Sequence, residues 1–145
     1  MNKKAIIAIG LTASTIFSGL VARQVIGSQA ADQCRVAVDS YTTLAEDQIK
    51  DMETAHSLVD MIVENPFSAL MVGGQLASIG AQSEGRWEDI DEAEGQYYDS
   101  CVQTGFLASI VDPYTDELRQ EKWATEAQLE STRDALLEAG KPLGW

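Results

Sequence analysis

The only histidine of this chain lies three residues after a glutamate, in the run Glu53-Thr54-Ala55-His56. A glutamate and a histidine at this spacing share one face of a helix, and di-iron helical bundles use such pairs as metal ligands. Those bundles need the motif twice, whereas this sequence of 145 residues has a single histidine. We therefore interpret His56 as a polar residue of an amphipathic helix, and we predict no metal and no cofactor.

Six carboxylates are concentrated in the eleven residues from Glu84 to Glu94. Hard cations such as calcium prefer oxygen ligands, which makes this segment a candidate cation site. The calcium-loop pattern fails, because a loop starting at Asp89 has Glu94 where glycine is needed and Ser100 where glutamate is needed. We predict a solvated acidic face that contacts a basic protein or weakly binds a cation. The face consists of Glu84, Glu88, Asp89, Asp91, Glu92 and Glu94.

Sequence signatures of catalysis are missing. The chain has no Gly-x-Ser-x-Gly motif, no phosphate-binding glycine-rich loop with lysine, and no Cys-x-x-Cys pair. A serine or cysteine nucleophile would have to use His56 as its base. We predict that the protein is not an enzyme.

Acidic residues outnumber basic ones by 23 to 10, which gives a net charge of −13. A nucleic-acid binder must neutralise phosphates with lysine and arginine, so this composition argues against nucleic acid as a partner. The same balance argues against a surface of anionic lipid headgroups. A basic partner is the kind that this charge attracts.

An uncharged, largely apolar run at residues 5–22 follows Lys3 and Lys4. Small residues at Ser28 and Ala30 offer a cleavage site, so residues 1–30 are interpreted as a signal peptide. The run is also just long enough to span a hydrocarbon core, so an uncleaved membrane anchor is the other interpretation. Under both interpretations, residues 31–145 are exported as one periplasmic or extracellular domain. This domain is either soluble after cleavage or anchored through residues 5–22.

Helical periodicity dominates residues 31–145, and strand patterns are nearly absent. From residue 31 to 64, apolar or small residues recur at steps of three, four or seven, with Asp32 placed to cap the start. The pair Asn65-Pro66 ends this helix, because a residue before proline avoids the helical conformation. A last helix is expected from Thr115 to Gly140. The first stripe consists of Cys34, Val38, Tyr41, Ala45, Met52, Ala55, Val59 and Ile62.

The two cysteines favour a hairpin. In an exported protein, two cysteines are expected to pair. Cys34 lies 32 residues before Pro66 and Cys101 lies 35 after it. An antiparallel hairpin with residues 67–111 as its second arm therefore brings them level, about 45–50 Å from the turn. We predict a Cys34–Cys101 disulfide in an all-α, elongated antiparallel hairpin that the last helix completes to a three-helix bundle.

Two alternatives to this architecture remain open. A break between Gly80 and Gly85 would divide the second arm and give a four-helix bundle. In the other, residues 66–83 form a second membrane span, which would place the two cysteines on opposite sides of the membrane. A helical stripe continues along the second arm from Trp87. We expect Trp87 and Trp123, the latter in the last helix, to lie in the core or the bundle seam.

Residues 66–83 carry no charge, although a turn between helices is usually polar. An uncharged tip is typical of a contact surface, and we assign this role to Phe67, Leu70, Met71 and Val72. The alternative is that the last helix returns far enough to cover them.

Together these features predict a non-enzymatic structural or interaction protein at a cell envelope or a membrane-bearing assembly. Its tip and acidic face contact protein partners, within a membrane complex if residues 5–22 are retained. The alternative is a soluble periplasmic or secreted binding module for a cation or a basic protein.

Overall fold

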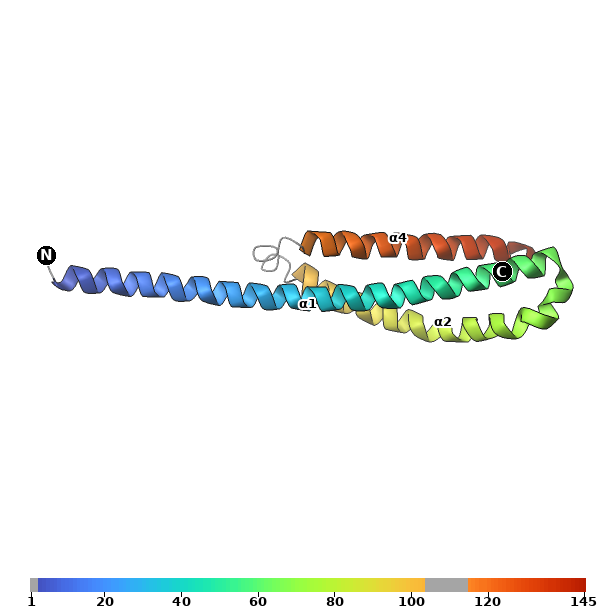
Figure 1. Cartoon of the computed structure of the whole chain (residues 1–145), viewed down its shortest axis with the longest axis horizontal. Coiled ribbons are helices and arrows are strands. Elements are labelled where there is room, and N and C mark those ends of the chain that lie inside the picture. Colours follow the sequence, from blue (N-terminus) through green and yellow to red (C-terminus); the bar gives the residue numbers. More distant parts are fainter. Residues whose placement is uncertain (1–2, 104–114) are drawn as a thin grey trace.

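The computed structural model describes the backbone of residues 3–103 and 115–145, and the side chains of residues 29–102 and 116–145. Two antiparallel helices form a hairpin, and a third packs chiefly along the first (Figure 1). The predicted all-α fold with three long helices is confirmed for these residues. The elements are α1 (Lys3–Glu64), η1 (Pro66–Ser68), α2 (Ala69–Tyr97), the π-helical η2 (Tyr98–Gln103), α4 (Thr115–Gly140) and η3 (Lys141–Leu143).

Helix α1 provides the core of the bundle. All eight residues of the predicted stripe between residues 31 and 64 are buried, because this stripe faces the other two helices. The helix ends at Glu64, and the Asn65 side chain accepts a hydrogen bond from the Phe67 backbone N–H at 3.2 Å. The prediction that Asp32 caps the start is wrong, because α1 is continuous from Lys3 and Asp32 is an exposed residue within it.

Helix α2 runs unbroken through both glycines that could have divided it. A Cβ at Gly80 or Gly85 would meet no other atom within 4 Å, so neither glycine is required by a close approach of another helix. The helix continues into η2, which carries Cys101. The four-helix alternative is therefore wrong for residues 69–103, while the rest of the expected arm, 104–111, lies outside the described residues.

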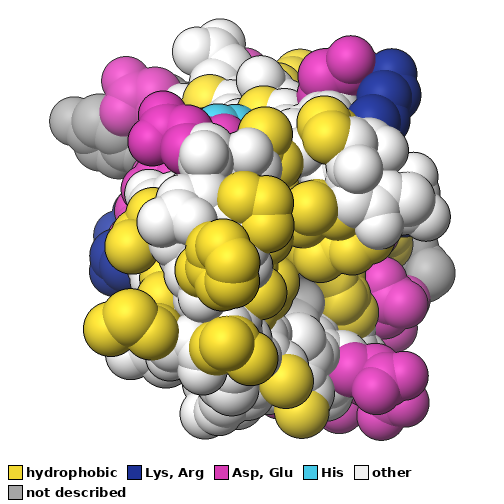
Figure 2. Space-filling view, turned by 90° about the vertical axis from the view of Figure 1, so that its right-hand side faces the viewer, with side chains coloured by type: hydrophobic (Ala, Val, Ile, Leu, Met, Phe, Trp, Pro, Cys, Tyr) yellow, Lys and Arg dark blue, Asp and Glu magenta, His cyan; other side chains and the backbone are white. Residues whose placement is uncertain are grey.

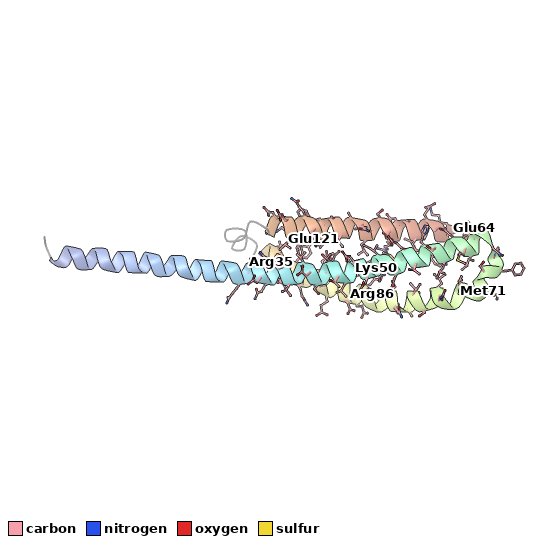
Figure 3. The ribbon with its side chains drawn as sticks, in the orientation of Figure 1. Arg35, Lys50, Glu64, Met71, Arg86 and Glu121 are labelled. Atoms are coloured by element: carbon pink, nitrogen blue, oxygen red, sulfur yellow. A yellow bond between two sulfur atoms is a disulfide. The ribbon has the colours of Figure 1, made fainter. Side chains whose placement is uncertain are left out.

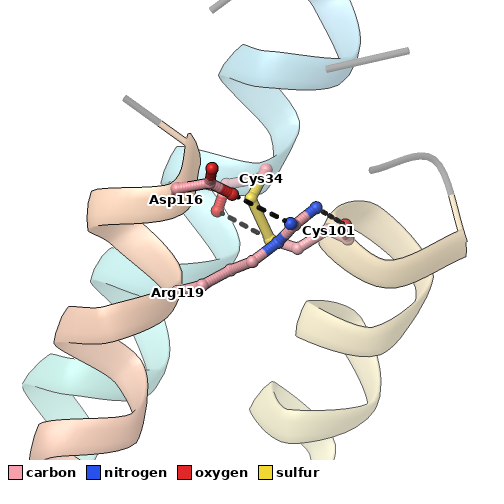
Figure 4. Close-up of a disulfide and its surroundings, with 4 residues drawn as sticks. All are labelled: Cys34, Cys101, Asp116 and Arg119. Atoms are coloured by element: carbon pink, nitrogen blue, oxygen red, sulfur yellow. Dashed lines mark hydrogen bonds and ion pairs between the residues drawn. A yellow bond between two sulfur atoms is a disulfide. The ribbon is translucent and has the colours of Figure 1, made fainter. Parts of the chain in front are cut away.

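The predicted disulfide is confirmed. The sulfur atoms of Cys34 and Cys101 lie 2.12 Å apart, their Cα atoms are 4.8 Å apart, and both residues are fully buried. Figure 4 shows the bond next to the start of α4. The bond joins the two arms on one side of any membrane, so the second-span alternative for residues 66–83 is wrong.

No helix among the residues with described side chains is long and apolar enough to cross a membrane. Residues 5–22 belong to α1, but their side chains lie outside the described set. The choice between signal peptide and anchor therefore stays a prediction.

The core is slender and divides into clusters along the rod. The central cluster draws on all three helices, and the cluster nearest the turn contains α1 and α2 residues only. Trp87 packs against the central cluster, as predicted. Trp123 was placed in the seam, but it is 58% exposed because the neighbouring Lys122 takes the inward position. The central cluster consists of Tyr41, Ala45, Ile49, Met52, Ile90, Ala93 and Leu129.

Candidate functional site

Three of the four residues assigned to the tip project from the turn into solvent. Phe67, Leu70 and Met71 are 80%, 88% and 85% exposed. The assignment of Val72 was wrong, since this side chain is only 8% exposed and packs against Leu58. Val72 begins the inward face of α2, so burial begins one residue after Met71 within the first turn of the helix.

The last helix does not cover the tip. Helix α4 ends at Gly140, short of the turn between α1 and α2 (Figure 1). Seen end-on, hydrophobic side chains gather over this face of the molecule, with acidic side chains towards its edges (Figure 2). In the side view, Glu64 and Met71 both lie at this end (Figure 3). The alternative of a covered tip is wrong for the described residues.

Two further apolar residues of α1 enlarge the exposed surface. Met61 is 47% exposed and Val63 is 41% exposed. The sequence reasoning missed them, although they lie on either side of the stripe residue Ile62 and therefore point away from the core. We call the combined surface the apolar end, and it consists of Met61, Val63, Phe67, Leu70 and Met71.

A shallow groove of about 440 Å³ is lined by residues of all three helices and by Trp145. It contains no charged side chain, and small residues of α2, among them Gly73 and Gly80, keep it open. Trp145 also lines it after folding back on Gly140, where a Cβ would clash with the indole ring. The lining consists of Met52, Ala55, Gly73, Leu76, Ala77, Ile79, Gly80, Ser83, Leu136 and Trp145.

Polar side chains next to this groove join α1 to α2. The Arg86 guanidinium donates to the backbone carbonyl of Asp47 at 3.2 Å and forms an ion pair with Asp51. The fully buried Gln48 side chain donates to the Ser83 hydroxyl. These contacts fix the register of α1 against α2 next to the acidic face.

Five of the six residues predicted for the acidic face are exposed. Glu84, Glu88, Asp89, Asp91 and Glu92 are exposed on α2. Glu94 does not belong with them, because its carboxylate turns towards α4 and binds Lys122 at 2.8 Å. The face therefore has five free-standing carboxylates in place of the six expected.

Glu53 and His56, the pair considered for metal binding, lie at the surface of the bundle. His56 Nδ1 lies 3.1 Å from an Asp60 carboxylate oxygen, one turn further along α1. Glu53 is exposed, and with His56 it borders a shallow hollow against α4. Among the described residues, no group of three histidine, cysteine, aspartate or glutamate side chains is placed to hold a metal ion.

Lys122 is the most unusual polar residue of the described part. Its side chain is 1% exposed, and its ammonium donates to Glu94 at 2.8 Å and to Glu126 at 2.7 Å. The ammonium also lies over the rings of Tyr41 and Tyr97, 4.7 and 5.2 Å from their centroids. These contacts join all three helices through one buried cation.

Burial and hydrogen bonding shift the pKa values of this cluster. It raises the pKa of Tyr41 to about 12, because the phenolate would be poorly hydrated, and it raises the pKa of Tyr97 in the same way. Burial alone would lower the pKa of Lys122, but the hydrogen bonds to Glu126 and Glu94 outweigh it and leave that pKa raised. The tyrosines therefore stay neutral and the lysine charged at neutral pH.

A pattern in the sequence could have predicted this cluster. Lys122 lies four residues after Leu118 and seven before Leu129, in phase with the apolar stripe of α4. A charged residue in such a position must face a partner, because an unpaired buried charge is very costly. The cluster joins the three helices around one buried ammonium.

No family model, curated protein or solved structure matches the chain. Its function therefore has to be inferred from the surfaces that the fold presents. The apolar end and the acidic face lie on different parts of the rod, so each can contact a partner without obstructing the other.

Proposed function

We propose that this is a non-enzymatic structural or interaction protein of a cell envelope or membrane-bearing assembly, which makes contact through its apolar end. One observation supports the proposal above the others. Phe67, Leu70 and Met71 are each at least 80% exposed, within a segment that carries no charge. A soluble protein seldom leaves several large apolar side chains together in water unless they meet a partner.

The exported location belongs to the same proposal. Lys3, Lys4 and the apolar run at residues 5–22 support export, and a buried disulfide suits an oxidising compartment. If residues 5–22 are retained, the continuous helix α1 holds the apolar end about 60 Å from the membrane that anchors it.

Site-specific photo-crosslinking in the producing organism tests this function. A photoreactive amino acid replaces Leu70, and the matched control carries it at Leu137, an exposed apolar residue of α4. We expect light-dependent adducts at position 70 that the additional Phe67→Ser and Met71→Ser changes abolish. Equal labelling at both positions, or no adduct at position 70, contradicts the proposal.

The five exposed carboxylates on α2 favour a second candidate, a soluble binding module for a basic protein. Glu84, Glu88 and Asp91 follow one another at helical spacing on the outward face. Reversing the charge at Glu88, Asp91 and Glu92 should then abolish binding of a basic partner, and salt should weaken the wild-type complex. Labelling at Leu70 should persist in that variant if the apolar end is the working surface.

A further inference from the structure

We propose that the apolar end inserts into the acyl region of an electroneutral lipid bilayer. The inference rests on the proposed function, which requires this end to be a contact surface, and it adds what the surface contacts. It draws on the size of the end, on its charge, and on the hydrogen bonding of the turn.

The apolar end is a narrow point made of few residues. Only α1, η1 and α2 reach it, and its five residues include just three that are at least 80% exposed, Phe67, Leu70 and Met71. A specific protein–protein interface takes about 20–30 residues from each partner. The apolar end alone offers far fewer, whereas a bilayer accepts a protruding apolar point without a matching surface.

The backbone N–H groups of the turn are paired within the turn. The N–H of Asn65 donates to the Met61 carbonyl at 3.0 Å, and that of Ser68 donates to the Asn65 carbonyl at 2.8 Å. The Phe67 N–H donates to the Asn65 side chain at 3.2 Å, and Pro66 has no N–H. Unpaired backbone donors are excluded from hydrocarbon, so a turn that pairs all of them internally suits insertion.

Charge selects the kind of lipid. No charged residue occurs between Glu64 and Glu84, so Phe67, Leu70 and Met71 enter the acyl region without a charged side chain, and Glu64 stays at the level of the headgroups. Both flanking residues are acidic, and the whole chain has a net charge of −13. An anionic headgroup surface would therefore repel this end, and zwitterionic phosphatidylcholine is the matching surface.

The test uses the full chain held in a phosphatidylcholine nanodisc, so that residues 5–22 are already occupied. A Phe67→Trp variant is mixed with separate phosphatidylcholine vesicles whose acyl chains are brominated, which quench an indole only at close range. We expect the fluorescence emission of the introduced tryptophan to shift to shorter wavelength and to be quenched. The parent chain, with its three native tryptophans, is the reference. Absence of quenching overturns the proposal.

Flotation with the same vesicles gives the affinities of matched variants. Leu70→Ser and Met71→Ser should each weaken binding roughly tenfold or more, because each removes a large apolar side chain from the acyl region. Trp123→Ser removes an exposed apolar residue of α4 and should change nothing. Equal loss in Trp123→Ser and Leu70→Ser overturns the proposal, and helical circular dichroism with an intact disulfide confirms that each variant is folded.

Asn65→Ala separates insertion from simple apolar contact. The change leaves Phe67, Leu70 and Met71 in place but removes the side-chain acceptor of the Phe67 N–H. We expect vesicle binding to fall roughly fivefold or more, because a free N–H enters the bilayer. Unchanged binding overturns insertion of the turn.

The outcome also separates this inference from the function on which it rests. Protein adducts at position 70 without tryptophan quenching would overturn the bilayer as partner and keep the apolar end as a contact surface. Stronger binding to vesicles with anionic lipid than to neutral vesicles would overturn the choice of an electroneutral bilayer. No adduct and no quenching would remove both proposals.

Discussion

The two ends of the three-helix bundle differ in how the helices are held together. At the disulfide end, α1, η2 and α4 meet, with the Cys34–Cys101 bond fully buried. Arg119 of α4 donates to the Cys101 carbonyl at 3.0 Å and to Asp116 at 3.1 Å (Figure 4). At the other end only two helices meet, no covalent bond joins them, and large apolar side chains face solvent.

This contrast shows how a slender bundle can expose an apolar surface and still stay folded. A small core gives a small free energy of unfolding, so an end that buries little apolar surface must be offset by interactions elsewhere. Here the cross-link and the buried Lys122 cluster lie together towards the end opposite the turn. The stabilising contacts are thus separated from the surface that we propose for contact.

The largest expected effect comes from removing the disulfide. The bond closes a loop of 67 residues, and in the chain-entropy model it stabilises the fold by about 4 kcal/mol. A variant with Cys34→Ser and Cys101→Ser should lose about that much free energy of unfolding, measured by urea denaturation with circular dichroism. A loss below about 1 kcal/mol would mean that the packing of the disulfide end holds without the bond.

The next effect concerns the two carboxylates that accept from Lys122. Glu94→Gln with Glu126→Gln leaves a buried ammonium without a counter-charge, and we expect a loss of about 3 kcal/mol in the free energy of unfolding. Lys122→Met should cost less than about 1 kcal/mol, because both carboxylates are about one-third exposed and can turn to water. Equal losses would show that the cation itself, over the tyrosine rings, is what stabilises this end.

Alkaline pH should weaken the same end. The pKa of Tyr41 is raised from 10 to about 12 on folding, so between these values the folded state holds a proton that the unfolded state has lost. Its contribution is fully present below pH 10 and is lost as the pH rises to 12, and the raised pKa of Lys122 acts in the same direction. Urea denaturation at pH 9 and pH 11.5 should show the fall, and a Tyr41→Phe variant should show a smaller one.

Sequence periodicity was sufficient for the hairpin but insufficient for its details. The stripe of α1, the stop at Asn65-Pro66, the start of α4 and the cysteine pairing all follow from local rules that the packing reinforces. Lys122 and Glu94 could not be placed in this way, because their positions depend on which side chains of other helices face them. Trp123 was misplaced for the same reason, since an adjacent lysine occupies the inward position.

The smallest effects distinguish two residues in the first turn of α2, Leu70 and Val72, that the sequence pattern treats alike. Val72 is buried against Leu58 and Ile62, so Val72→Ala leaves a small void and should cost about 1–2 kcal/mol. Leu70→Ala removes more apolar atoms from a side chain that is 88% exposed, and it should change the free energy of unfolding by less than about 0.5 kcal/mol. Urea denaturation of the two variants provides the comparison. A Leu70 loss as large as that of Val72 would mean that the apolar end packs within its own chain and is not available to a partner.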